Sequence, residues 1–277
     1  MKQEKMTQGW MQLSGRGGVL VLAALLLVGA GPVEGAEAVE DAAKTNPSVT
    51  ELSENWQFSV SAYGWMPSIK ADSRVGPDID ITLKDILDNL DGVIMLKAGA
   101  RKGRWSLFQD LIYLDLEDDA TVKLPESAKL KLDLTMKSWI STMGAGYTVF
   151  YNDDFSVNVL GGARFLYLDL DLDAKVKGTD YKDNVSGSQN AWNGIVGLSG
   201  KVQFPKQWYG VYYADIGTGD SHLTYQAMGA VGYRFEKFAV SGGYRYLRWN
   251  FHKDDDLGAA MKNLKVAGPF VALDYNF

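Results

Sequence analysis

The chain has no cysteine and only two histidines among its 277 residues. Without cysteine it holds no disulfide and no thiolate metal centre. Beyond residues 1–38, no apolar run approaches the roughly 18 residues that a membrane-spanning helix needs. The formal net charge of −6 at pH 7 also argues against nucleic acid as a partner. These absences turn attention to strands and to their alternation of side chains.

Residues 1–38 have the pattern of a cleaved secretory signal. Lys2 and Lys5 give a basic start, and residues 18–30 form an apolar stretch too short to cross a bilayer as a helix. Residues 36–38 read Ala-Glu-Ala, an A-x-A cleavage site, with cleavage just before this tripeptide as an alternative. A retained membrane anchor is the competing interpretation. We therefore expect an exported protein.

Residues 55–277 read as a series of strands, because apolar and polar side chains alternate along each stretch. Short links alternate with longer ones, except at 219–221, as in barrels with short turns at one end and longer loops at the other. The pattern predicts an all-β fold: an antiparallel up-and-down transmembrane β-barrel of about ten strands, with eight or twelve as alternatives. A soluble lipocalin-like barrel or sandwich is the competing architecture. The predicted strands cover 55–66, 93–102, 104–119, 129–150, 155–174, 187–203, 209–218, 222–235, 238–252 and 264–277.

The last predicted strand ends on an aromatic residue with no polar tail after it. Val271, Leu273, Tyr275 and Phe277 share one face of this strand. In this feature the chain resembles the outer-membrane β-barrel proteins of Gram-negative bacteria, in which such a terminal pattern is the assembly signal. The resemblance implies a place in the outer membrane and contact with its lipid and lipopolysaccharide. It also implies recognition by the barrel assembly machinery.

A second resemblance rests on three short runs at residues 103–107, 162–165 and 243–246, which read Gly-Arg-Trp-Ser-Leu, Gly-Ala-Arg-Phe and Gly-Tyr-Arg-Tyr. They look like those of a small, uncharacterised family of proteobacterial barrels, which implies the fold and the location but no defined activity. On this reading residues 39–54 form a flexible periplasmic tail and residues 55–277 the barrel. Aromatic residues near predicted strand ends should then lie at the membrane interfaces: Trp56, Trp105, Tyr147, Trp192, Tyr233, Phe235 and Phe277.

Charged residues occur inside the alternating strand patterns and should point into the lumen, since a charge facing lipid at mid-membrane costs roughly 2–4 kcal/mol. Two interpretations compete. Either these charges pair and fill a narrow lumen, or their cationic excess lines a water path or binds an anion. The predicted lumen charge network consists of Lys97, Arg101, Asp110, Arg164, Lys201, Asp215, Arg234, Arg245 and Asp274.

One helix is expected in the first long link. Thr82 and Asp85 fit a capping box, and Leu83, Ile86, Leu87 and Leu90 then form an apolar stripe of helical spacing, with Gly92 as a stop. The stripe should fold into the barrel mouth as a plug or constriction, or pack within its own loop.

Candidate catalytic residues are few. Asp220 and His222 form an Asp-x-His pair beside a predicted outer loop, as an omptin-like protease or a lipid A-modifying hydrolase would need at its rim. The motif carries little information, so we expect no enzyme activity, no cofactor and no metal. The sequence favours a structural or surface-interaction barrel, or a narrow pore with a charge-filled lumen. The alternative is a rim-active hydrolase that uses His222, and the oligomeric state stays open.

Overall fold

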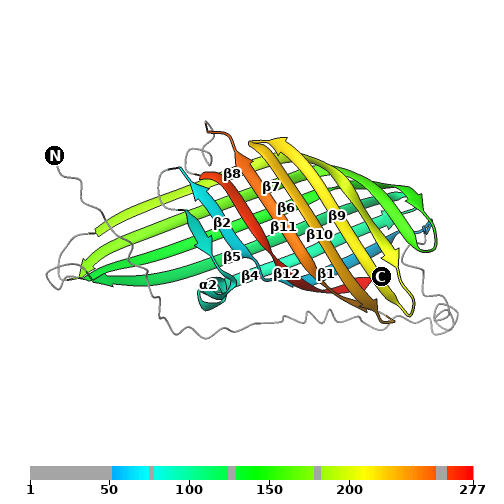
Figure 1. Cartoon of the computed structure of the whole chain (residues 1–277), viewed down its shortest axis with the longest axis horizontal. Coiled ribbons are helices and arrows are strands. Elements are labelled where there is room, and N and C mark those ends of the chain that lie inside the picture. Colours follow the sequence, from blue (N-terminus) through cyan, green and yellow to red (C-terminus); the bar gives the residue numbers. More distant parts are fainter. Residues whose placement is uncertain are drawn as a thin grey trace, which may run out of the picture.

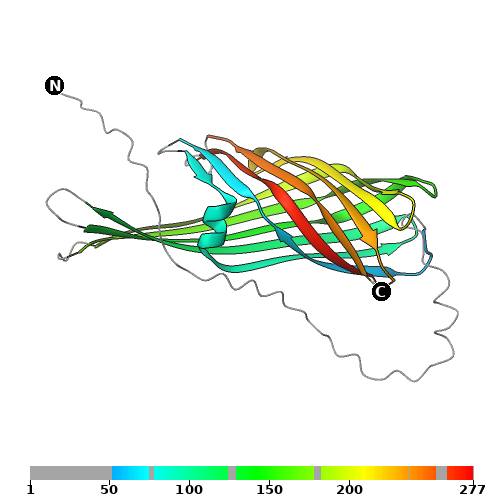
Figure 2. The same ribbon diagram turned by 60° about the horizontal axis from the view of Figure 1, so that its bottom comes forward.

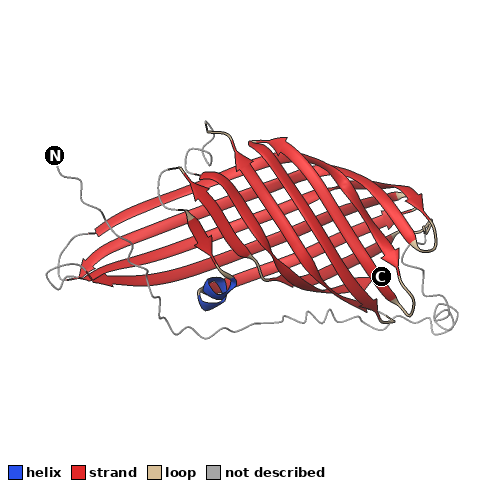
Figure 3. Cartoon of the chain, in the orientation of Figure 1, coloured by secondary structure: helices blue, strands red, loops and turns tan. Residues whose placement is uncertain are grey.

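A computed structural model describes residues 52–74, 78–123, 129–177, 182–236, 238–253 and 261–276. They form a single antiparallel sheet that curls into a barrel, with one short helix beside it (Figures 1 and 3). The predicted signal, most of the predicted tail and Phe277 lie outside the described residues. In the part that is described, no helix has the length and apolarity to cross a membrane.

Ten strands make the barrel wall, each paired with its neighbours in sequence. They are β1 (Gln57–Trp65), β4 (Leu90–Lys102), β5 (Trp105–Lys123), β6 (Lys129–Tyr151), β7 (Phe155–Lys177), β8 (Lys182–Gln203), β9 (Trp208–Gly219), β10 (Ser221–Arg234), β11 (Phe238–Phe251) and β12 (Met261–Asn276). The first strand closes the ring, because Val60 lies opposite Ala98 of β4 on one side and opposite Tyr275 of β12 on the other. The predicted closed ten-stranded antiparallel barrel is confirmed.

The two ends of the barrel differ. We call the end with the tight links at 103–104, 152–154 and 204–207 the turn end, and the opposite one the loop end. Side chains alternate between lumen and outside, as predicted. On β11, Ser241 and Arg245 are buried whereas Val240 and Tyr244 are exposed. Along β12, Val271, Leu273 and Tyr275 are each about half exposed and point outward.

The wall is interrupted near the loop end by two short strands that the sequence did not reveal. After β1, the chain breaks at Met66-Pro67 and resumes as β2 (Ser68–Ser73), which pairs with the other half of β12 and then turns into β3 (Ile79–Ile81). The break follows from proline, which lacks the N–H that a central ladder requires. Segment 67–92 was predicted to be a link without strands, and this prediction was wrong. The strands were missed because the alternation at Ile69 and Ala71 is short and sits among charged residues.

From Leu90 to Met95, toward the loop end, β4 pairs with none of the described strands on its β1 side. The wall therefore has a seam near the loop end, between the β2–β3 hairpin and β4. Helix α2 (Leu83–Asp88) lies across this seam and joins β3 to β4 (Figures 1 and 2).

The predicted capping box of α2 is present. The Thr82 hydroxyl accepts a hydrogen bond from the Asp85 backbone N–H at 3.3 Å, and the Asp85 carboxylate accepts one from the Thr82 N–H at 2.9 Å. Hydrogen bonding from the Thr82 side chain also lowers the pKa of Asp85. The predicted stop at Gly92 is wrong: the helix ends at Asp88 with Asn89 as its cap, and Gly92 belongs to β4.

The apolar stripe of α2 is directed inward at Ile86, which is buried against Leu114 and Leu116 of β5. Both leucines share the lumen-facing register of Asp110 and Ile112. The helix thus covers inward-facing side chains at the loop end.

Strands β5 to β8 extend well past the rest of the wall (Figure 2). They form two hairpins side by side, whereas β9 and β10 end at Gly219 and Ser221. The loop-end boundary of β6 was predicted correctly, but the predicted β5, β7 and β8 stopped too early because charged residues interrupt the alternation there. The result is a four-stranded sheet that projects from the loop end.

Two glycines on neighbouring strands let the wall bend tightly. Gly144 and Gly162 are directly paired, and a Cβ on Gly162 would lie 2.0 Å from the Met143 carbonyl oxygen. A Cβ on Gly144 would lie 2.3 Å from the Gly161 carbonyl oxygen. The next residue, Gly161, points outward and has nothing closer than 3.8 Å.

This contrast gives a matched test. Gly162→Ala is expected to destabilise the barrel by at least the roughly 1–3 kcal/mol of an overpacked site, because the clash is with backbone. Gly161→Ala should be tolerated. Denaturant unfolding of both variants in phospholipid vesicles measures the difference, and equal unfolding midpoints would contradict the prediction.

Candidate functional site

The lumen is crossed near mid-height by a buried ion pair. Arg164 of β7 lies 2.5 Å from Asp215 of β9, and both side chains are fully buried. The same guanidinium donates to the hydroxyl of Thr142 at 3.3 Å and of Thr224 at 3.0 Å. These partners come from β6 and β10, so one arginine connects strands along the arc from β6 to β10.

A second ion pair joins opposite walls at a similar level. Arg245 of β11 lies 2.8 Å from Asp110 of β5, and the Tyr63 hydroxyl donates to Asp110 at 2.6 Å. Arg245 also donates to the side-chain oxygen of Gln226 at 2.7 Å and stacks over the Trp65 ring at 4.8 Å. Its charge is therefore compensated and its donors are largely used.

An apolar layer lies on the loop-end side of these pairs. In the register, Ile112, Ile140, Leu166 and Ala191 are direct neighbours across β5 to β8, one inward position beyond the row of Asp110, Thr142 and Arg164. From the other wall come Leu247 and Trp249, which like Leu166 are 0% exposed. The layer and the ion pairs together fill this part of the lumen.

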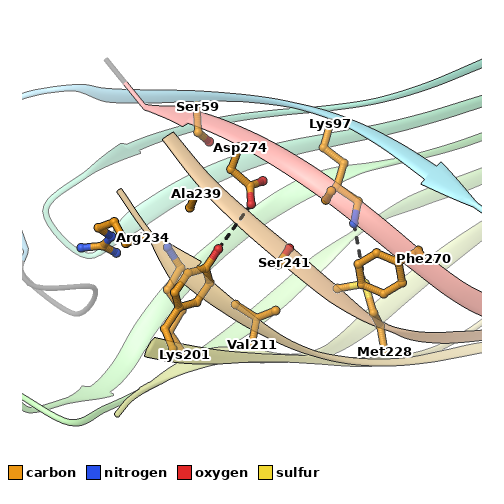
Figure 4. Close-up of a pocket in the computed structure, with 12 residues that line it drawn as sticks. Ser59, Lys97, Lys201, Val211, Met228, Arg234, Ala239, Ser241, Phe270 and Asp274 are labelled. Atoms are coloured by element: carbon orange, nitrogen blue, oxygen red, sulfur yellow. Dashed lines mark hydrogen bonds between the residues drawn. The ribbon is translucent and has the colours of Figure 1, made fainter. Parts of the chain in front are cut away.

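A cavity of about 150 Å³ lies on the turn-end side of the ion pairs (Figure 4). Lys97, Lys201 and Arg234 line it, together with Asp274. The Asp274 carboxylate accepts hydrogen bonds from the Ser61 hydroxyl and, at 3.4 Å, from Tyr209. Lys97 places its ammonium 3.6 Å from the Met228 sulfur and over the Tyr63 ring.

The nine predicted lumen charges thus divide into two sets. Four of them form the two mid-height ion pairs, Arg164 with Asp215 and Arg245 with Asp110. Lys97, Lys201, Arg234 and Asp274 line the cavity, and Arg101 shares its inward register position with Lys97 on β4. The sequence did not reveal the neutral partners Tyr63, Gln226 and Thr224, or the apolar layer, because these residues are common on strands of any kind.

The two candidate residues at the rim, Asp220 and His222, have separate contacts. The Asp220 carboxylate accepts a hydrogen bond from the Trp192 backbone N–H at 2.8 Å, and no hydrogen bond joins it to His222 among the described residues. His222 is exposed, and its ring meets the His252 ring edge-on at 4.8 Å. The described residues also contain no group of three or more side chains suited to hold a metal ion.

The outer surface between the two ends is apolar, because each strand of the barrel wall carries large exposed apolar side chains there. Aromatic residues gather toward the turn end, where Trp56, Trp105, Trp208 and Phe235 are exposed. A second group includes Trp139 and Trp192, farther toward the loop end. Along β8, the stretch from Trp192 to Gln203 is long enough to supply the roughly 9–11 residues that a tilted transmembrane strand needs. The class of fold is therefore a closed antiparallel barrel of the outer-membrane type.

No protein-family model matches the chain, and no curated protein matches its sequence. Among solved structures, it is similar to the outer membrane protease OmpT from Escherichia coli, at 11% identity over 85% of this chain and 100% of that one, with a TM-score of 0.47. It is also similar to the translocator domain of the autotransporter NalP from Neisseria meningitidis (14% identity, 87% and 93% covered, TM-score 0.41). A third is Ail, the attachment invasion locus protein of Yersinia pestis (14% identity, 81% and 99% covered, TM-score 0.36). Identities this low carry no information on activity, and the small barrel family suggested by residues 103–107 stays a prediction.

The ion pair between Arg164 and Asp215 is open to a direct test. Asp215→Leu leaves Arg164 buried and unpaired, which is expected to cost about 3–5 kcal/mol of stability. Adding Arg164→Met should restore most of that loss, because both charges are then gone. Denaturant unfolding in phospholipid vesicles measures each variant.

The exposed pair of Lys70 and Asp80, 2.6 Å apart, supplies the control. Asp80→Leu should change stability by about 0–1 kcal/mol, as at other surface ion pairs. A wild-type unfolding midpoint for Asp215→Leu would show that the buried pair does not hold the walls together.

Proposed function

We propose that this protein is an integral outer-membrane β-barrel that is non-conducting and non-enzymatic, and that acts through the sheet projecting from its loop end. The observation that carries the proposal is the filled mid-section of the lumen. Fully buried Arg164, Leu166, Leu247 and Trp249 occupy the space that a through channel would need. Ten strands enclose little more room than the eight-stranded barrels whose interiors are just filled by side chains.

The membrane location is supported by the outer surface. Val196, Ile216, Val231 and Leu198 are exposed on the wall between the aromatic groups, and such a band is stable only against lipid. On this proposal the turn end faces the periplasm and the loop end faces outward, because short turns mark the periplasmic side of such barrels.

The proposal that the protein is not an enzyme rests on the contacts of Asp220 and His222 at the loop-end rim. A general base needs an orienting partner within hydrogen-bond reach, and Asp220 is instead bound to the Trp192 N–H. His222 contacts His252, which offers no carboxylate to orient it.

The projecting sheet supports a surface role. From Trp139 back to Lys129, β6 continues past the second aromatic group, the one with Trp139 and Trp192. An extended strand rises roughly 3.3 Å with each residue, so this continuation projects well beyond that group. On the outer edges of the projection, β8 is paired with β9 only from Asn193 onward, and β5 with β4 only up to Leu116. Such edges and their faces are available to other molecules at the cell surface.

Planar-bilayer recording tests the closed lumen. The purified protein is expected to give no steady ion current, because the apolar layer excludes hydrated ions. An Ile86→Asp variant, which loosens α2, should stay closed as well, since the layer lies nearer the turn end. Regular single-channel steps from the unmodified protein would contradict the proposal, and steps in the variant alone would make α2 the gate.

Membrane insertion is tested on β8. Val196→Arg puts a charge at the middle of the proposed lipid-facing band and should cost about 2–4 kcal/mol of folding free energy in bilayers. Ser188→Arg places the same side chain on the same strand face beyond Trp192 and should cost far less. Equal stability of the two variants in vesicles would rule out a lipid-facing band at Val196.

A further inference from the structure

The cavity near the turn end differs from the layer above it in its balance of charge. At mid-height each buried arginine faces an aspartate. Around the cavity, the two lysines Lys97 and Lys201 meet a single lining carboxylate, that of Asp274. In Figure 4 these side chains come from different strands and surround one space. The lining therefore carries an excess of positive charge.

Within the described ranges, neither Lys97 nor Lys201 forms an ion pair with a carboxylate. Lys97 instead lies against the Met228 sulfur and the rings of Tyr63 and Phe270, the latter at 5.4 Å. Asp110 lies opposite Lys97 in the β4–β5 register, but its carboxylate is paired with Arg245. The Asp274 carboxylate is held by hydroxyl groups of Ser61 and Tyr209.

Like charges gathered in a space bounded by protein repel one another more strongly than in open water. Such a cluster is stabilised when an ion of opposite sign enters and replaces the lost hydration. The cluster also has the donors that an oxyanion needs. Lys97 and Lys201 offer compact ammonium groups, and Ser59 and Ser241 line the same cavity with hydroxyls.

We propose that this cavity is a binding site for a small phosphate-type oxyanion that enters from the turn end. A volume of about 150 Å³ is well above the roughly 10–15 Å³ that one water molecule needs on the same measure. A tetrahedral oxyanion and several waters fit in that space. The filled mid-section closes the opposite side, so the ligand enters and leaves by one mouth and is bound, not conducted.

Isothermal titration of inorganic phosphate into the purified full-length protein tests the site, in a non-ionic detergent at low ionic strength. One saturable binding event is expected. Lys201→Met keeps the length of the side chain but removes its charge, and it should weaken binding at least tenfold. Lys102→Met is the matched control, because Lys102 is exposed at the same end of the barrel and faces outward; its binding should equal that of the parent.

A third variant separates a binding role from damage to the fold. Asp274→Asn keeps a hydrogen-bonding group beside Ser61 and Tyr209 but removes the negative charge, so it should tighten phosphate binding several-fold. A distorted barrel would weaken binding in both variants. Opposite changes for Lys201→Met and Asp274→Asn support the site; absence of saturable binding, or equal binding by the parent and Lys201→Met, overturns it.

The phosphate group could come from solution or from a lipid headgroup, and nanodiscs distinguish these sources. In discs of phosphatidylcholine alone, phosphate should bind as in detergent. If added phosphatidic acid removes this binding, the headgroup competes for the site and is a ligand. Unchanged binding assigns the site to soluble oxyanions. The phosphate site and the closed lumen are tested by different experiments. A lack of phosphate binding would overturn the site, but it would not change the result of the conductance recording.

Discussion

Closure of the sheet through β1 is the constraint on which the rest of the structure depends. Because β1 pairs with both β4 and β12, ten strands form a ring, and every second side chain on that ring must fit inside it. A ring of this size has little room to spare. Charges that point inward therefore lie within reach of other strands: Arg245 meets Asp110 on the opposite wall, and Arg164 meets Asp215 two strands away. The same ion pairs that fill the lumen also fasten strands that are far apart in the sequence.

Much of the wall could be predicted because a strand repeats its two faces every two residues. That period assigned Asp274 and Arg245 to the lumen and Leu273 and Tyr244 to the outside, as the structure has them. The capping box at Thr82 was also predictable, since it depends on two side chains three residues apart. Local rules of this kind need no knowledge of the partner strand.

The contents of the lumen could not be predicted in the same way. Which inward residues meet depends on the stagger between strands, so nothing in the sequence joins Tyr63 to Asp110 or Arg164 to Thr224. The division of the predicted charges into balanced pairs and a cationic cavity has the same origin. The break at Met66-Pro67 was misread for another reason: a proline ends a ladder, but it does not say that the chain will resume along the same neighbour.

The seam beside α2 has a consequence for how the protein can change shape. Through most of the ring, widening the barrel would require breaking a ladder of backbone hydrogen bonds. Among the described residues no backbone ladder joins the β2–β3 hairpin to β4, and Ile69 and Ile81 of the hairpin instead pack against the cluster of Ile86, Leu114 and Leu116. The circumference is thus fixed at the turn-end half and adjustable at the loop-end half. Free energies of local opening should follow the same division, with the lowest values beside the helix and the highest near β1 and its two partners.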